Sequence, residues 1–189
     1  GEVRARAVVL ATGASPREMG LPGERELRGR GVGYCATCDG MMYRNKTVAV
    51  LGGGNSAVAD ALYLSKLCRE VYLIHRRDTL RASKVYMDAL KDSGIQILWN
   101  SRAVELLRDK RVSGLILEDV RTGARRELAC EGIFVAIGRV PDTELFRGQV
   151  ELDEQWYIKA DETTRTGLPG VFAVGDVRTK PLRQIVTAT

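Results

Sequence analysis

The sequence predicts an α/β fold in which helices cover a parallel sheet and an antiparallel meander is attached. Short, wholly apolar runs alternate with amphipathic segments, as expected for parallel strands that are buried on both faces. A glycine-rich turn at residues 52–54 joins one apolar run to an amphipathic segment. Further on, alternating segments at residues 103–107, 115–120 and 126–130 are separated by polar turns, which predicts the meander.

The first half of the chain contains a complete strand–helix–strand unit. Residues 7–11 form a short apolar run closed by a glycine turn, which predicts a buried strand. Residues 47–51 predict a second strand, residues 56–68 a helix with one apolar face, and residues 71–74 a third strand. A strand, a helix and a strand within about 30 residues form a βαβ unit with parallel strands.

Beyond residue 80, the sequence predicts one further helix and three further strands. Residues 83–92 predict a helix, and residues 95–99 predict the strand that follows it. Residues 133–137 and 171–174 are all-apolar runs that each end at a glycine, which predicts two more buried strands.

Two polar stretches with proline and glycine, near residues 20 and 139, predict linkers that divide the chain into three parts. The first stretch runs up to Gly33. The middle part, residues 21–139, is expected to be a nearly complete nucleotide-binding domain. Residues 1–20 and 140–189 are each too small to fold alone, so we expect them to belong together in a second domain.

Composition restricts the class of protein. The 189 residues are 44% apolar and 28% charged, which fits one or two small folded domains with real cores. No apolar run approaches the roughly 18 residues of a membrane span, and no basic-then-apolar leader opens the chain, so a cytoplasmic location is expected. The net charge of +5 is modest and aromatic residues are only 6%, so a nucleic-acid partner is not expected.

The glycine-rich turn has the spacing Gly52-x-Gly54-x-x-Ala57. Gly52 permits a tight turn, Gly54 lets backbone amides approach a pyrophosphate, and Ala57 allows the helix to pack closely on the strand. Any glycine-rich turn could match this pattern by chance. Its place between a strand and a helix favours a Rossmann-like dinucleotide site.

The residues after the next strand predict which dinucleotide is bound. An acid there would bind the ribose 2′-hydroxyl of NAD. The chain instead has His75-Arg76-Arg77, with Arg81 one helical turn further on. These cations suit a 2′-phosphate, which favours NADP(H). The alternative is a solvated basic loop.

Two of the four cysteines, Cys35 and Cys38, are separated by two residues. That spacing allows a small disulfide and commonly makes one thiol reactive. The adjacent Asp39 could act as a general acid for a departing thiolate. Two alternatives stay open, namely a structural zinc site that also uses Cys68 and Cys130, and a pair of inert buried thiols.

Six motifs occur in order along the chain, and their combination resembles a single family. From residue 7 to the end, the chain resembles the low-molecular-weight, bacterial-type thioredoxin reductases, a flavoprotein family of pyridine nucleotide-disulfide reductases. The motifs are Tyr34-Cys-Ala-Thr-Cys-Asp-Gly40, Gly52-Gly-Gly-Asn-Ser-Ala57, His75-Arg-Arg-x-x-x-Arg81, Phe134-Val-Ala-Ile-Gly138, Pro169-Gly-Val-Phe-Ala-Val-Gly-Asp176 and Arg183-Gln184.

The resemblance implies a role for each matching residue. Cys35 and Cys38 would form the redox-active disulfide, with Cys38 facing the flavin, Cys35 attacking thioredoxin and Asp39 donating a proton. The implied NADPH residues are Gly53, Gly54, Asn55 and Ser56 at the pyrophosphate, His75, Arg76, Arg77 and Arg81 at the 2′-phosphate, and Ile137 and Gly138 at the nicotinamide. The implied FAD residues are Thr12, Gly13, Asp176, Arg183 and Gln184.

The resemblance also implies a route for electrons, from NADPH through FAD to the disulfide and on to thioredoxin. In the family, the two domains rotate about their linkers and the enzyme is a homodimer. A glycine fingerprint for FAD is missing before residue 7, so we expect a fragment with an incomplete FAD site and little activity alone. The alternatives are a non-catalytic NADP(H)-binding redox module and the flavoprotein subunit of an alkyl hydroperoxide reductase.

Overall fold

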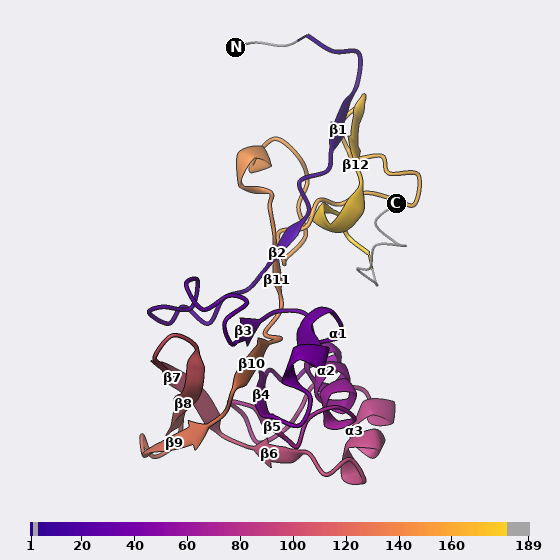
Figure 1. Ribbon diagram of the computed structural model, residues 1–189. Helices are drawn as coiled ribbons and strands as arrows, with labels where there is room; N and C mark the ends of the chain where they lie inside the picture. The colour runs from indigo at the N-terminus through magenta and orange to yellow at the C-terminus, as the bar shows by residue number, and fades with distance from the viewer. Residues whose placement is uncertain (2–3, 181–189) are drawn as a thin grey trace. The chain divides into compact units, whose positions relative to one another are not determined.

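The computed structural model describes residue 1 and residues 4–180 of the chain (Figure 1). The chain divides into two compact units. Unit 1 comprises Gly1–Ser15 and Arg139–Thr189, and unit 2 comprises Pro16–Gly138. No helix in the described residues is both long enough and apolar enough to cross a membrane.

Unit 2 is built on a five-stranded parallel sheet, which confirms the predicted fold class (Figure 1). The strands lie in the order β3, β10, β4, β5, β6, and every neighbouring pair is parallel. Because β10 lies between β3 and β4, the sheet joins segments that are far apart in the chain. The strands are β3 (Val32–Gly33), β4 (Thr47–Leu51), β5 (Glu70–Ile74), β6 (Gln96–Leu98) and β10 (Gly132–Val135).

Two helices follow the strands as predicted. Helix α2 (Asn55–Ser65) follows β4, and helix α3 (Lys84–Lys91) follows β5. Helix α2 is shorter than the expected helix over 56–68, because residues 66–68 leave the helix in a turn. Its buried face consists of small and branched apolar side chains, namely Ala57, Val58, Ala61 and Leu64.

Both faces of the parallel sheet are buried, as predicted for such strands. The side chains of β4 show the arrangement, since Val48 and Val50 belong to a core cluster with helix α2, whereas Ala49 and Leu51 belong to a cluster with the meander. Successive side chains of a strand point to opposite faces. Helices therefore cover one face of the sheet, and the meander covers the other.

The meander is also confirmed. Strands β7 (Ser101–Arg108), β8 (Val112–Asp119) and β9 (Arg125–Ala129) form an antiparallel sheet in that order. Leu115 and Leu117 of β8 are fully buried against the parallel sheet. Since alternate residues of β8 face inward, the period-2 pattern in the sequence was sufficient to identify this layer.

The glycine-rich stretch before the cysteine pair, predicted as a linker, is largely folded. Leu27 is buried in the core of unit 2, and β3 joins the edge of the parallel sheet. Before it, β2 (Ala14–Pro16) pairs with β11 (Arg139–Pro141) in a two-stranded sheet. The two chain segments near residues 16 and 139 are thus hydrogen-bonded to each other rather than free.

Unit 1 has a small core around one parallel strand pair. Strands β1 (Val8–Leu10) and β12 (Val171–Ala173) pair in register, inside the ranges that the sequence predicted. Two 3-10 helices, η2 (Glu144–Phe146) and η3 (Gly175–Val177), complete the described elements of this unit. The core cluster consists of Leu10, Ile158, Ala173 and Val177.

Candidate redox and dinucleotide site

The predicted site residues of unit 2 gather at one edge of the parallel sheet. Parallel strands end at the same edge, and the loop after each strand carries one predicted group. Cys35 follows β3, Ile137 follows β10, Gly52 follows β4 and His75 follows β5. Chain order reverses between β10 and β4, and ligands of open parallel sheets bind at such a reversal. The fold thus places the cysteine pair and the glycine turn at the same edge of the sheet, with strand β10 between the two strands that precede them.

Each glycine of the turn meets a different requirement. Gly52 has φ +151°, and a Cβ there would overlap the Ala136 carbonyl oxygen and the Cβ of Ala57. A Cβ at Gly53 would overlap the imidazole of His75. At Gly54, the residue before helix α2, no atom lies within 4 Å of the position a Cβ would take. Gly52 and Gly53 therefore permit close packing, whereas Gly54 borders open space.

His75 is buried beneath the glycine turn, with 6% of its surface exposed. Its Nε2 atom has no hydrogen-bond partner among the described residues. Burial lowers the pKa of His75, and the three neighbouring arginine charges lower it further, while a backbone hydrogen bond with Thr79 opposes the shift. The neutral imidazole is therefore favoured. His75 is therefore buried, whereas the three arginines with which the sequence analysis grouped it are exposed.

Two backbone N–H groups of the basic loop after β5 donate hydrogen bonds, one to the glycine turn and one to the first residue of helix α2. The N–H of Arg81 donates to the Gly53 carbonyl at 2.7 Å, and the N–H of Ser83 donates to Asn55 Oδ1 at 2.8 Å. Three exposed guanidinium groups of this loop form no hydrogen bond or salt bridge with the described residues. They belong to Arg76, Arg77 and Arg81. Ser56 is exposed nearby in the first turn of α2.

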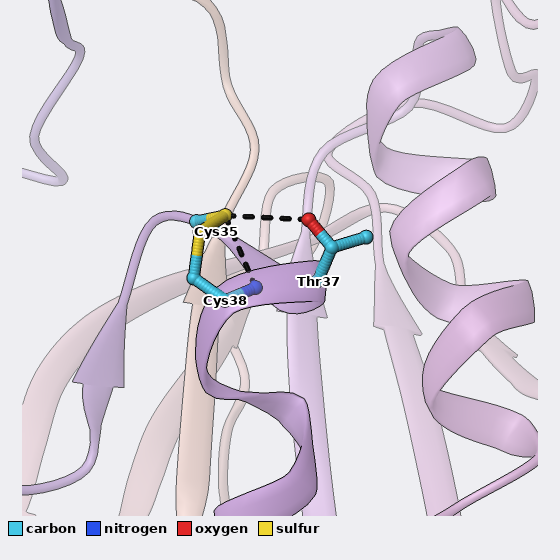
Figure 2. Close-up of a disulfide and its surroundings, with 3 residues drawn as sticks. All are labelled: Cys35, Thr37 and Cys38. Atoms are coloured by element: carbon cyan, nitrogen blue, oxygen red, sulfur yellow. Dashed lines mark hydrogen bonds between the residues drawn. A yellow bond between two sulfur atoms is a disulfide. The ribbon is translucent and has the colours of Figure 1, made fainter.

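Cys35 and Cys38 are joined by a disulfide at the start of the short helix α1 (Ala36–Asp39), as Figure 2 shows. The Cys38 N–H donates to Cys35 Sγ at 3.2 Å, and Thr37 Oγ1 lies 3.4 Å from the same sulfur. Cys35 is half-buried and Cys38 is exposed. The two sulfurs are bonded to each other, as a redox-active disulfide requires. A zinc site would instead need two separate thiolates.

The disulfide turn is packed firmly onto the rest of unit 2. Asp39 ends helix α1, and its carboxylate lies against Gly33 of β3, where an added Cβ would be 3.3 Å from Oδ2. The next residue, Gly40, packs closely on helix α2, so that a Cβ would lie 2.9 Å from the Tyr63 ring and 3.1 Å from Leu64. Helix α2 thus connects the glycine turn at its start with the disulfide turn at its side.

The predicted flavin residues of the described chain lie in unit 1, after its two parallel strands. Thr12 and Gly13 follow β1, and Asp176 follows β12, so both groups lie at the same end of this strand pair. The Thr12 hydroxyl donates to the Asp142 carbonyl at 2.6 Å. Asp176 Oδ1 is buried without a hydrogen bond, 3.4 Å from the Lys180 ammonium. Arg183 and Gln184 lie outside the described residues.

Comparison with known proteins identifies the family. The whole chain, residues 1–189, matches the pyridine nucleotide-disulphide oxidoreductases. The chain belongs to the pyridine nucleotide-disulphide oxidoreductase family. Within this family it is similar to the thioredoxin reductase of Treponema pallidum (strain Nichols), with 50% identity over 190 residues that cover 100% of this chain and 62% of the relative.

Two further pyridine nucleotide-disulphide oxidoreductases are similar over almost the whole chain. The thioredoxin reductase of Streptomyces clavuligerus is 47% identical over 187 residues, which cover 98% of this chain and 58% of that protein. The crystal structure of Lactococcus lactis thioredoxin reductase superposes with a TM-score of 0.82 at 43% identity and covers 96% of this chain and 61% of that one. The chain thus spans about three fifths of the length of these relatives.

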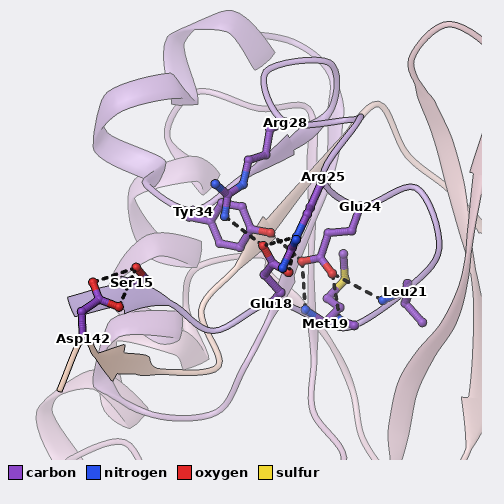
Figure 3. A network of polar contacts seen from close by, with 10 residues as sticks. Ser15, Glu18, Met19, Leu21, Glu24, Arg25, Arg28, Tyr34 and Asp142 are labelled. Carbon is purple, nitrogen blue, oxygen red and sulfur yellow. Dashed lines mark hydrogen bonds and ion pairs between the residues drawn. The ribbon is translucent and has the colours of Figure 1, made fainter. Parts of the chain in front are cut away.

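A buried carboxylate, Glu24, contacts Tyr34, the residue before Cys35 (Figure 3). Glu24, only 2% exposed, accepts hydrogen bonds from the Tyr34 hydroxyl at 2.6 Å and from the Met19 and Gly20 N–H groups at 2.9 and 2.8 Å. Burial, and then the bond to Glu24, raise the pKa of Tyr34 to about 12. The Arg28 guanidinium lies 4.6 Å from the centre of the same ring. Tyr34, the residue before Cys35, is therefore held by Glu24 at its hydroxyl and by Arg28 at the face of its ring.

The other two cysteines of this family member are free thiols. Cys130 is buried and Cys68 is half-buried. Burial raises the pKa of Cys130 to about 12 and that of Cys68 to about 11, so both remain protonated at neutral pH. Within residues 1 and 4–180, no group of three or more histidine, cysteine or acidic side chains is arranged to hold a metal ion.

The burial of Asp60 in helix α2 predicts that the stability of unit 2 depends on pH. Burial raises the pKa of Asp60 from 3.8 to about 6. Below pH 4 the side chain is protonated in both the folded and unfolded states, whereas between pH 4 and 6 only the unfolded state ionises. Folded stability that is present at low pH is therefore lost as the pH rises through 6. We expect Asp60→Asn to stabilise unit 2 at pH 8 by about 1–2 kcal/mol, after allowance for partial exposure, and to have no effect at pH 4.

Urea unfolding followed by tryptophan fluorescence measures this effect. A Trp156→Phe background leaves Trp99 as the reporter of unit 2, because the chain has two tryptophans. The matched control is Asp109→Asn, which changes an exposed aspartate in the β7–β8 turn. A stability gain that is the same at pH 4 and pH 8, or that the control shares, would contradict the assignment to Asp60.

Proposed function

We propose that the protein functions as an NADPH-dependent thioredoxin-disulfide reductase that uses FAD. One observation carries the proposal: a disulfide and a glycine-rich turn flanked by unpaired arginines occupy one edge of one parallel sheet. A disulfide alone would fit many folds, and a dinucleotide turn alone would fit many oxidoreductases. The combination fits an enzyme that moves electrons between a nicotinamide and a dithiol. The similarity to thioredoxin reductases supports thioredoxin as the protein substrate.

Unit 2 would bind NADPH. The open space beside Gly54 suits the pyrophosphate, with Gly53, Asn55 and Ser56 around it. The three unpaired guanidinium groups of the basic loop suit the 2′-phosphate, and the imidazole of His75, whose Nε2 has no hydrogen-bond partner among the described residues, packs against Gly53. Ile137 and Gly138, after β10, would lie at the nicotinamide. When bound, this cofactor supplies a hydride.

Unit 1 would contribute residues to the FAD site. Unit 2, residues 16–138, would be the NADPH-binding domain predicted over residues 21–139. The Oδ1 atom of Asp176 is buried and accepts no hydrogen bond among the described residues, although the Lys180 ammonium lies 3.4 Å away, so it suits a hydroxyl donor such as that of a ribitol chain. Thr12 and Gly13 lie at the same end of the strand pair as this carboxylate. The homodimer implied by the resemblance is part of the same proposal.

The protein's own chemistry is thiol–disulfide exchange. After two electrons break the Cys35–Cys38 bond, the Cys35 thiolate attacks one sulfur of the thioredoxin disulfide, and the other thioredoxin sulfur leaves with a proton from an acid such as Asp39. The Cys38 thiol then loses its proton, and its sulfur attacks Cys35 in the mixed disulfide. This second attack re-forms the Cys35–Cys38 bond and releases the second thioredoxin sulfur, which takes up a proton to become a thiol. No metal ion is required for either step.

Serine variants of the two cysteines test the proposal in the whole, FAD-loaded protein. We expect Cys35→Ser and Cys38→Ser each to reduce NADPH-dependent thioredoxin reduction by about a thousandfold or more, because the two sulfurs act as a unit. Reduction of ferricyanide by NADPH, which needs only the flavin, should persist. Cys68→Ser is the matched control and should retain both activities.

The outcomes separate the alternative functions. Thioredoxin reduction that survives Cys35→Ser would contradict the proposed route. A protein that binds NADPH yet reduces neither acceptor would be a redox module without catalysis. Cysteine-dependent electron transfer that bypasses thioredoxin and reduces another thioredoxin-like domain would favour an alkyl hydroperoxide reductase subunit.

A further inference from the structure

The two sulfurs of the disulfide differ in their polar contacts (Figure 2). Cys35 Sγ lies 3.2 Å from the Cys38 backbone nitrogen, which donates to it, and 3.4 Å from Thr37 Oγ1. Among the described residues, no hydrogen bond reaches Cys38 Sγ. Since a disulfide sulfur carries no proton, the Thr37 hydroxyl is the donor in this contact. Two donors are therefore directed at Cys35.

These contacts gain strength when the disulfide is reduced. A disulfide sulfur is a weak acceptor, whereas a thiolate is a charged acceptor, and hydrogen bonds to charged groups are about twice as strong. A donor that is already in place stabilises the charge without a cost of reorganisation. The thiolate is also the reactive form of a cysteine. The arrangement thus favours negative charge on Cys35 over Cys38.

The surroundings of Thr37 leave its hydroxyl free for this contact. Thr37 is exposed, and its side chain makes no other hydrogen bond in the described part of the chain. Removing the hydroxyl would therefore leave no buried group unpaired. A purely structural role would require contacts that the threonine does not make.

We propose that Thr37 is a further catalytic residue, whose hydroxyl donates a hydrogen bond to the Cys35 thiolate. The inference deepens the proposed function and rests on it, because it explains why Cys35 is the sulfur that attacks. Two electrons break the Cys35–Cys38 bond and one proton is taken up, which leaves Cys38 as a thiol and Cys35 as a thiolate. The thiolate then forms a new bond to a substrate sulfur, and the substrate's other sulfur leaves with its electron pair.

The test compares Thr37→Val, which removes the hydroxyl but keeps the shape, with Thr37→Ser, which keeps the hydroxyl. The whole protein is reduced and alkylated with iodoacetamide over a series of pH values, and the label on Cys35 is quantified by mass spectrometry. For Thr37→Val we expect the midpoint of the alkylation profile to rise by about one pH unit. Thr37→Ser should give a profile close to that of the unaltered protein.

Turnover gives a second readout. Thr37→Val should lower kcat/KM for thioredoxin by about tenfold, without changing the rate at which NADPH reduces the flavin. An unchanged alkylation profile in Thr37→Val, or a serine variant that fails to restore it, overturns the proposal. Failure of the proposed function looks different: the unaltered protein would not reduce thioredoxin, while alkylation of Cys35 would still respond to the valine substitution.

Discussion

Replacing Arg76 and Arg77 together with glutamine is expected to weaken NADPH binding about a hundredfold and to leave NADH binding nearly unchanged. Both guanidinium groups are exposed and unpaired within the described residues, so each can donate to a 2′-phosphate without first breaking a salt bridge. A charge-assisted hydrogen bond contributes about tenfold in affinity, and two act on one phosphate group. NADH lacks that phosphate and therefore loses nothing. Titration calorimetry with each dinucleotide measures the two affinities.

A matched control removes the same charge elsewhere on unit 2. Arg121 and Arg126 are exposed residues at the β8–β9 end of the meander, and neither forms a salt bridge with the described residues. Their glutamine double variant keeps the net charge equal to that of the test variant. Beyond a screening length of about 10 Å, these charges should not influence the site. Equal losses of NADPH affinity in both variants would show that overall charge, not the basic loop, selects the cofactor.

The sequence was sufficient to predict an element wherever its local residue pattern agrees with its burial in the structure. Strand β4 coincides with the predicted range because all five of its residues are apolar or β-branched and all are buried. The glycine turn was recognisable since Gly52 must adopt a positive φ and Ala57 must remain small. The end of helix α2 was predicted too late, because no glycine or proline marks its last turn in the sequence.

Contacts between distant segments could not be predicted from one sequence. Strand β3 has only two residues, too few for a periodic pattern, and it exists because it pairs with β10. The same pairing places Cys35 beside the loop that follows residue 135. His75 was grouped with the arginines by adjacency, and only the fold distinguishes a buried imidazole from three exposed cations.

Glu24 was missed for a related reason. It lies in a stretch rich in glycine and proline, between Pro22-Gly23 and several charged residues, which is the usual composition of a solvated linker. Its burial depends on the Met19 and Gly20 amides and the Tyr34 hydroxyl, which converge only when the chain folds back on itself. A charged side chain that is buried and fully hydrogen-bonded has no signature in a single sequence.

Replacing Glu24 with alanine is expected to destabilise unit 2 by about 3–5 kcal/mol. The substitution would leave the Met19 and Gly20 N–H groups and the Tyr34 hydroxyl without their acceptor, and buried donors without partners cost about 1–3 kcal/mol each. Tyr34→Phe removes one donor and leaves the backbone bonds in place, so it should cost only about 1 kcal/mol. Urea unfolding followed through Trp99 gives both values.

The neighbouring Glu26 provides the control, because it is a glutamate of the same segment in a different environment. Its side chain is 73% exposed and forms a salt bridge with Arg108. Exposed pairs of this kind contribute about 0–1 kcal/mol, so Glu26→Ala should be nearly neutral. If both alanine variants had equal stability, the buried network would not hold this segment. A large loss confined to Glu24→Ala would instead show that one carboxylate anchors the chain on which Tyr34, and therefore Cys35, is positioned.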